Sequence, residues 1–114
     1  MSKKFEAYVK RALRKLFAWW PPRAQARRRQ EVSKGWYACN ICAKIFHRSA
    51  THVDHIEPVV IPGIVSDWNG YIERLYCSVE NLQVLCKGCH AQKTKKENAE
   101  RSKVRRRQAR PKSS

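Results

Sequence analysis

Apolar and polar residues follow a helical spacing in the first third of this chain. Between residues 3 and 20, apolar side chains recur every three or four positions with Lys and Arg between them, which predicts an amphipathic helix. The apolar positions are Phe5, Tyr8, Val9, Leu13, Leu16, Phe17 and Trp20. We expect Pro21 and Pro22 to end this helix. The strongly basic stretch 23–33 predicts a second helix, which Gly35 closes.

The spacing shortens after Gly35, where β-branched and aromatic residues alternate with polar ones. Segments 36–46 and 51–56 predict two short strands, with a cysteine pair near the turn that leads into them. Further along, segment 80–86 predicts a turn followed by another strand.

The remaining segments are a loop and two helices. Residues 58–71 are rich in Pro and Gly and predict a loop, at whose end Asp67 or Asn69 can cap a short helix over 71–77. Residues 88–108 predict a long basic helix. The mixture indicates an α+β fold, and 114 residues suffice for one small domain with a modest core.

Cysteine spacing is the strongest local signal for chemistry. Cys39 and Cys42 form one C-x-x-C pair, and Cys86 and Cys89 form a second. Four thiolates in this arrangement can close a tetrahedral Zn²⁺ site that joins two distant parts of the chain. The alternative is four reduced cysteines buried as small apolar residues. Cys77 is expected to be a packed thiol.

Positive charge is concentrated at the two ends of the chain. The formal net charge is +16, of which residues 1–35 carry +9, residues 36–92 carry −1 and residues 93–114 carry +8. Such a charge favours a polyanionic partner, with nucleic acid ahead of anionic membrane. A near-neutral centre between two basic arms is typical of a site that must be delivered to nucleic acid.

No segment predicts a membrane span or a signal peptide. The longest early apolar run, LFAWW, has five residues, far below the roughly 18 that a span needs. We therefore expect a cytoplasmic protein, in which thiols stay reduced and cysteine pairs bind metal.

Two separated motifs carry a resemblance to a known family. The sequence DHIEP at 54–58 and the sequence ENLQVLCKGCHAQKT at 80–94 together resemble the HNH endonuclease family, with His55, Asn81 and His90 at the family's letters. The insert DWNGYIERLYC between them is similar to that of small HNH proteins from tailed bacteriophages. The resemblance covers about half of the chain, from Trp36 to Thr94.

The resemblance implies a ββα-metal fold, in which two antiparallel strands and a helix surround one divalent ion. By position, Asp54 and His90 would hold a catalytic Mg²⁺, Mn²⁺ or Ni²⁺, His55 would be the general base, and Asn81 would brace the loop that orients His55. An imidazole titrating near neutral pH suits the activation of water against a phosphodiester. Some family members supply a further histidine where this chain has Thr94, so the ion would have only two protein ligands.

The expected organisation is a basic helical arm over 1–35, an HNH nuclease domain over 36–100 stapled by the zinc site, and a basic, flexible tail over 101–114. DNA is the expected substrate, no small-molecule substrate is expected, and the phage resemblance makes the large terminase a candidate partner in a host cytoplasm. The expected DNA contacts are the basic side chains Arg27, Arg28, Arg29, Lys93, Lys95, Lys96, Arg105, Arg106 and Arg107.

Other interpretations of the same features remain open. A non-catalytic zinc-ribbon DNA-binding protein, or a degenerate module of the HNH type, would use the same cysteines and basic arms without cutting. Charge alone also fits a basic RNA-binding or ribosomal protein, although the near-neutral centre disfavours it. The helix predicted over 3–20 could pack on the domain, lie on an anionic membrane or dock on a partner.

Overall fold

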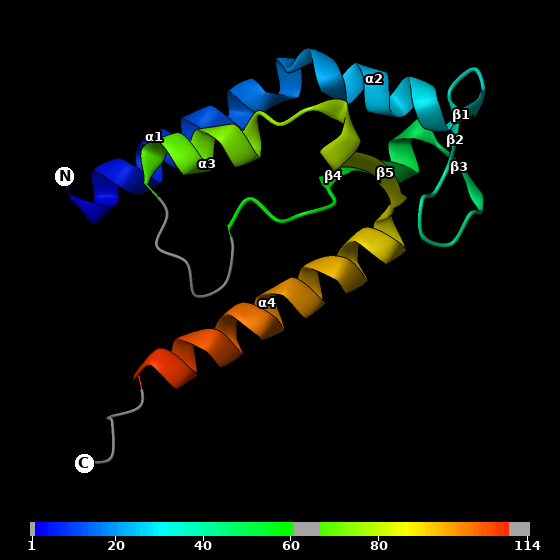
Figure 1. The fold of residues 1–114 in the computed structure, drawn as a ribbon. Helices are drawn as coiled ribbons and strands as arrows, with labels where there is room; N and C mark the ends of the chain where they lie inside the picture. Colours follow the sequence, from blue (N-terminus) through cyan, green and yellow to red (C-terminus); the bar gives the residue numbers. More distant parts are fainter. Residues whose placement is uncertain (1, 61–66, 110–114) are drawn as a thin grey trace.

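The computed structural model describes residues 2–60 and 67–109, so part of the loop predicted over 58–71 lies outside the described residues. Helices and strands alternate, which confirms the α+β class (Figure 1). The helices and 3-10 turns are α1 (Lys3–Leu16), η1 (Phe17–Trp19), α2 (Pro21–Gln30), η2 (Arg48–Ala50), α3 (Trp68–Leu75), η3 (Val79–Asn81) and α4 (Lys87–Ala109). The strands are β1 (Glu31–Ser33), β2 (Trp36–Ala38), β3 (Ile45–His47), β4 (Thr51–His55) and β5 (Leu82–Cys86).

The amphipathic helix predicted over 3–20 is α1 continued by η1. The second helix begins earlier than predicted, because Pro21 and Pro22 occupy its first positions, where a missing N–H costs no hydrogen bond. It also ends earlier. Residues Glu31–Ser33 leave the helix and form β1, so the predicted helix end at 33 is wrong.

The segment 36–46, predicted as one strand, is a hairpin of two strands. β2 lies between β1 and β3 in a three-stranded antiparallel sheet, and the turn between β2 and β3 carries the first cysteine pair. Ala43 adopts a positive φ of 64° in this turn, and Gly35 adopts one of 82° between β1 and β2. The tight turn through the two cysteines interrupts the strand.

The second sheet pairs β4 with β5, antiparallel, with Asp54 opposite Gln83 and His55 opposite Leu82. All five residues of β5 are buried, because both α2 and α4 contact this strand. α4 starts directly after β5, where the Cys86 sulfur accepts the Cys89 N–H (3.4 Å), one of the free donors of a helix start.

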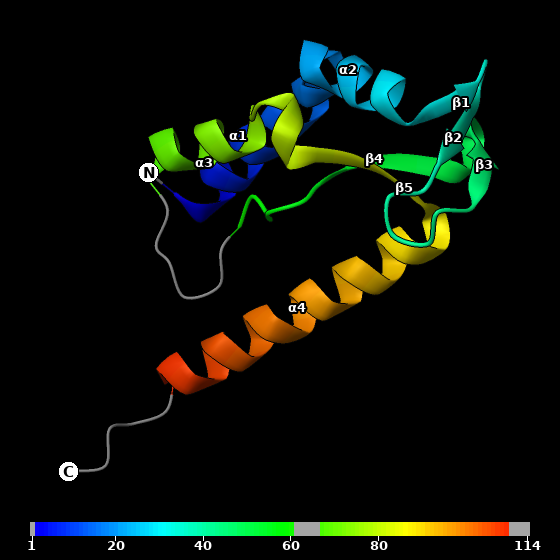
Figure 2. The ribbon, with the colours of Figure 1, turned by 45° about the vertical axis from the view of Figure 1, so that its right-hand side comes forward.

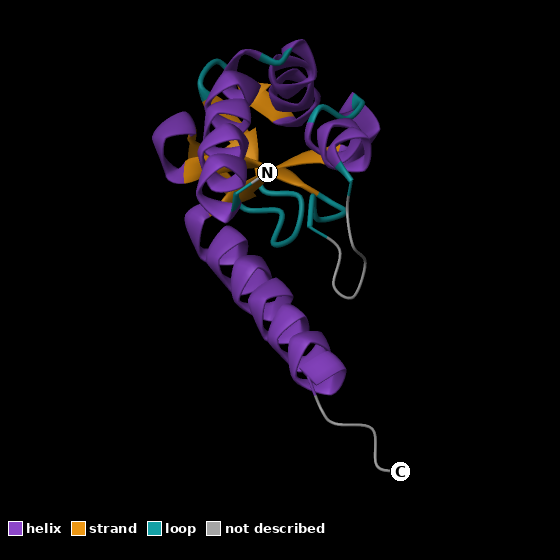
Figure 3. Cartoon of the chain, turned by 90° about the vertical axis from the view of Figure 1, so that its left-hand side faces the viewer, coloured by secondary structure: helices purple, strands orange, loops and turns teal. Residues whose placement is uncertain are grey.

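α4 leaves the body of the protein and projects away from it, as Figures 1 and 2 show. Figure 3 shows α4 extending from the body of the protein in a view turned by 90°. The helix predicted over 88–108 is therefore present. The expected flexible tail over 101–114 needs correction, because residues 101–109 are the last turns of α4; residues 110–114 lie outside the described part of the chain.

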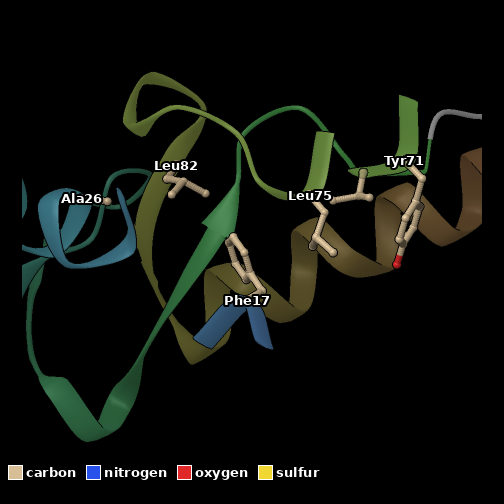
Figure 4. Close-up of a cluster of buried hydrophobic side chains, with 6 residues drawn as sticks. Phe17, Ala26, Tyr71, Leu75 and Leu82 are labelled. Atoms are coloured by element: carbon tan, nitrogen blue, oxygen red, sulfur yellow. The ribbon is translucent and has the colours of Figure 1, made fainter. Parts of the chain in front are cut away.

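One hydrophobic cluster joins the N-terminal segment to the rest of the chain (Figure 4). Phe17 and Ala26 come from residues 1–35, Tyr71 and Leu75 from α3, and Leu82 from β5. The end of the helix predicted over 3–20 therefore packs on the domain through Leu13 and Phe17, whereas α1 buries no residue completely. None of the helices in the described residues has the length and apolar content that crossing a membrane requires.

Two polar side chains hold the start of α3 and the edge of β5 in place. Asp67, one of the two predicted caps, accepts the Gly70 N–H at the start of α3 (2.8 Å). At the end of α2, the Gln30 amide donates to the carbonyls of Ala38 (2.7 Å) and Val84 (2.8 Å) and accepts the Val84 N–H (2.7 Å). One side chain therefore connects α2 and both sheets.

Candidate functional site

Four cysteines meet where the two sheets approach each other. Cys39 and Cys42 lie in the turn after β2, Cys86 ends β5, and Cys89 lies in the first turn of α4. Their sulfur atoms all lie within 4.8 Å of one another. Sulfurs bound to one tetrahedral zinc at about 2.3 Å are separated by roughly 3.8 Å, so the cluster can hold such an ion after a small contraction.

The protonation of these thiols also favours a bound cation. Burial works to raise the pKa of Cys39, but hydrogen bonds from backbone groups of Cys42, Cys86 and Ile41 lower it to about 6. The pKa of Cys89 shifts in the opposite direction. Its hydrogen bond with Cys86, together with burial, raises that pKa to about 12. Sulfurs this close cannot all ionise unless a cation balances them, and a zinc ion bound among them would supply that charge.

A second place of chemical interest is a cavity of about 210 Å³, here called the β4–α4 cavity. It is lined by side chains from α1, β4, the segment after β4, and α4. They are Arg14, Asp54, His55, Pro58, Val59, Val60, His90, Thr94, Glu97, Asn98 and Arg101. Three of the predicted site residues, Asp54, His55 and His90, thus border one cavity.

Asp54 faces α4 and receives several polar groups. Its Oδ1 lies 3.7 Å from Nε2 of His90, and its Oδ2 accepts the Gln83 side-chain N–H (3.3 Å). Gln83 is buried and accepts in turn from the Asn40 amide (2.7 Å), next to the first cysteine pair. A chain of hydrogen bonds therefore connects Asn40, the sequence neighbour of Cys39, to the Asp54 carboxylate.

Lys93, which the sequence predicts as a DNA contact, lies beside Asp54 in this site. Only 18% of its side chain is exposed, and its ammonium lies 3.0 Å from Asp54 Oδ2. It also pairs with Glu97 and donates to the His55 carbonyl (2.8 Å). Burial works to lower the pKa of Lys93, but the contacts with Glu97 and Asp54 outweigh it and raise the pKa. The lysine therefore stays charged.

His55, which also lines the β4–α4 cavity, is held by contacts with α3 and η1. Its Nε2 lies 2.8 Å from the Leu75 carbonyl, and its ring stacks on Phe17 with centroids 4.9 Å apart. A carbonyl accepts only, so Nε2 carries the proton in this bond and Nδ1 is the ring's acceptor. Burial, with the nearby charges of Arg14 and Lys93, lowers the pKa of His55 despite the opposing effect of the Leu75 contact. The ring is therefore neutral at pH 7.

Asn81 connects β5 to the residues that follow His55. Its Oδ1 accepts the Glu57 N–H (2.9 Å), its amide donates to the Glu57 carbonyl (3.4 Å), and its own carbonyl accepts the Ile56 N–H (2.8 Å). These bonds hold the chain just after His55, where a bracing residue would act.

The residues around Asp54 fit a divalent ion only in part. Two donors that each lie about 2.1 Å from one ion are at most about 4.2 Å apart, so the 3.7 Å between Asp54 and His90 allows a shared ion. His52 stacks on His90 (4.7 Å between centroids) and adds no ligand. In residues 2–60 and 67–109, the four cysteines are the one group of three or more possible ligands that come together.

Some of the side chains predicted to contact DNA have partners within the protein. Arg27 donates to Thr51 Oγ1 (3.0 Å), and Arg29 pairs with Glu80 (3.5 Å). Arg29 is nevertheless exposed, as are Arg28, Lys95, Lys96, Arg105, Arg106 and Arg107. Sequence reasoning missed Arg14 and Arg101 at the β4–α4 cavity, since no local pattern distinguishes them from the other arginines.

Comparison of the chain with known protein families, curated proteins and solved structures found no match.

Proposed function

We propose that this protein is a metal-dependent endonuclease of the HNH type that hydrolyses phosphodiester bonds in DNA. One observation carries the proposal: Asp54, His55 and His90, from two segments far apart in the sequence, border a single cavity between β4 and α4. The net charge of +16 supports a nucleic-acid substrate. The pairing of β4 with β5, followed by α4, supports a ββα arrangement around that cavity.

In this proposal His55 is the general base. The Leu75 carbonyl holds the proton on Nε2, so Nδ1 can accept a proton from water. Stacking on Phe17 fixes the ring, and its lowered pKa keeps the basic form populated at neutral pH. A positioned base of this kind contributes about 10²–10⁴-fold to rate.

Asp54 and His90 are the proposed ligands of a Mg²⁺, Mn²⁺ or Ni²⁺ ion. When bound, such an ion polarises the scissile phosphate and offsets negative charge that develops as the bond breaks. Arg14 and Arg101, at the rim of the same cavity, are suited to orient the phosphate. Asn81 keeps the segment after His55 in position through its two contacts with Glu57.

Lys93 favours a second candidate function, a zinc-stabilised DNA-binding protein that does not cut. Its ammonium already neutralises the Asp54 carboxylate, at 3.0 Å, and opposes binding of a divalent cation there. For the nuclease, Asp54 would have to exchange its contact with Lys93 for a bound ion. In a DNA-binding protein that does not cut, the Lys93–Asp54 ion pair would persist because no catalytic ion competes for Asp54.

The discriminating experiment is cleavage of supercoiled plasmid with Mg²⁺, Mn²⁺ or Ni²⁺ added in turn. We expect nicked or linear product from the wild type and at least 10²-fold less from His55→Ala. His47→Ala is the matched control, because His47 is exposed on β3, where its ring bonds to Ser49 and contacts Trp36, away from the β4–α4 cavity. It should cut like the wild type.

Zinc content and DNA affinity must be equal in the three proteins. If His55→Ala cuts as well as the wild type, the base assignment is wrong. A wild type that binds plasmid but cuts with none of the ions supports the binding protein instead.

A further inference from the structure

A cavity of about 410 Å³ lies apart from the cysteine cluster and from the β4–α4 cavity, and neither zinc binding nor the proposed catalysis uses it. It lies between α2 and the β2–β3 sheet, and we call it the arginine cavity. Its charged lining is Arg23, Arg27, Arg28 and Arg48, and its aromatic lining includes Trp19 and Tyr37.

Positive charge in the arginine cavity has no acidic counterpart. Within residues 2–60 and 67–109, none of its four arginines forms an ion pair with Asp or Glu. Burial, followed by repulsion from Arg48, lowers the pKa of both Arg23 and Arg27. Arginine remains protonated in proteins, so the shift reflects the cost of burying a cation and the nearby charge of Arg48, and not a neutral side chain. An anion would relieve this repulsion.

A buried donor in the same place lacks a partner. The Nε of Arg23 is inaccessible to solvent and makes no hydrogen bond, and such an unmet donor is costly. The guanidinium of Arg23 donates through Nη1 to the Ala18 carbonyl (3.1 Å) and lies 5.2 Å from the centre of the Phe17 ring. A small shift of this fork toward a phosphate would satisfy Nε.

Trp19 adds a flat apolar surface at the rim. Its side chain is 86% exposed, the most exposed of the large apolar residues, although every other aromatic residue of η1 and the following turn packs inward. An exposed indole beside arginines suits a nucleic-acid base, because bases stack on aromatic rings whatever their identity. In a duplex the faces of the bases are covered, so the fitting base is an unpaired one.

The arginine cavity is also near the β4–α4 cavity. Phe17 contacts Arg23 and also stacks on His55. Along β4, Thr51, which bonds Arg27, precedes Asp54 by three residues, or about 10 Å of strand.

We propose that the arginine cavity binds a phosphate of single-stranded DNA and that Trp19 stacks on the adjoining unpaired base. The inference shares with the proposed nuclease function only its ligand, DNA, and requires no cleavage. A nucleotide held there would reach the catalytic cavity through a short stretch of the same strand.

The test is binding of a labelled single-stranded oligonucleotide, and of the matching duplex, measured by fluorescence anisotropy without added divalent ion. The variants are Arg48→Gln and Trp19→Ala, whose side chains are exposed. Each should weaken single-strand binding roughly tenfold and duplex binding much less. Arg48→Gln should also reduce the salt slope by about 0.7, the value for one single-strand phosphate contact.

Arg11→Gln and Tyr8→Ala, both exposed on α1, are the matched controls and should change the affinity less than about twofold. Variants that bind the single strand like the wild type would overturn the proposal, as would equal losses for single strand and duplex. Inorganic pyrophosphate that displaces the oligonucleotide at equal phosphate concentration would show a free-anion site instead. If the wild type binds but never cuts, the nuclease proposal fails and this one stands.

Discussion

Gln30 is expected to contribute more to stability than any exposed residue of α2. Its amide makes three hydrogen bonds, two with Val84 and one with Ala38, and so covers the edge of β5 that β4 leaves open. Val84 is completely buried. The same bonds hold β2, which leads to Cys39, beside β5, which ends at Cys86.

Replacing Gln30 by Met keeps the length and volume of the side chain and removes all three bonds. Each is worth about 0.5–1.5 kcal/mol, and the Val84 N–H loses its only acceptor in a buried position. Allowing for partial replacement by water, we expect the free energy of unfolding to fall by about 2–4 kcal/mol. Because the two cysteine pairs would be held less firmly together, zinc affinity should also fall.

Urea unfolding at saturating zinc, followed by tryptophan fluorescence, measures the loss of stability. Competition with a chromophoric chelator measures the loss of zinc affinity. Gln25→Met, at an exposed position of the same helix, is the control and should change stability by less than about 0.5 kcal/mol. If Gln30→Met is as stable as this control, the side chain does not connect the sheets and the reasoning is refuted.

Four further predictions address the metal, the base and the arms. Metal analysis should find one zinc per wild-type chain and none in Cys86→Ser, and circular dichroism should show the variant unfolded, because the binding energy of a structural zinc is largely folding energy. The cleavage rate should rise with pH through a value below 6.5, because the neutral form of His55 is the base and burial lowers its pKa; a rise only above pH 7 in the pH–rate profile would contradict this. Asn81→Ala should cost only about 1 kcal/mol in urea unfolding yet slow cleavage roughly tenfold, since it loosens the segment at Glu57 without removing a reacting group. Deleting residues 101–114 removes seven positive charges and should flatten the salt dependence of DNA binding, whereas an unchanged slope would show that these residues do not touch phosphate.

Features that depend on residues close together in the sequence could be predicted from the sequence alone. The spacing of apolar residues over 3–20 predicts α1 because a helix repeats every 3.6 residues whatever it packs on. The C-x-x-C spacing predicted that four sulfurs could meet, since each pair is held in a single turn. The predicted helix 23–33 failed at its end because Glu31–Ser33 pair with β2, a choice that local propensity does not contain.

The surroundings of the site residues were decided by the tertiary structure alone. The sequence presents Asp54 and His55 as one pair, but alternation along β4 turns Asp54 toward Lys93 and His55 toward Phe17. The same holds for the arginine cavity, where Arg48 meets Arg23 across elements distant in the chain. The sequence determines the charge and the shape of each side chain. Its partners, and hence its pKa and its burial, follow from long-range packing, which brings together groups that no local pattern relates.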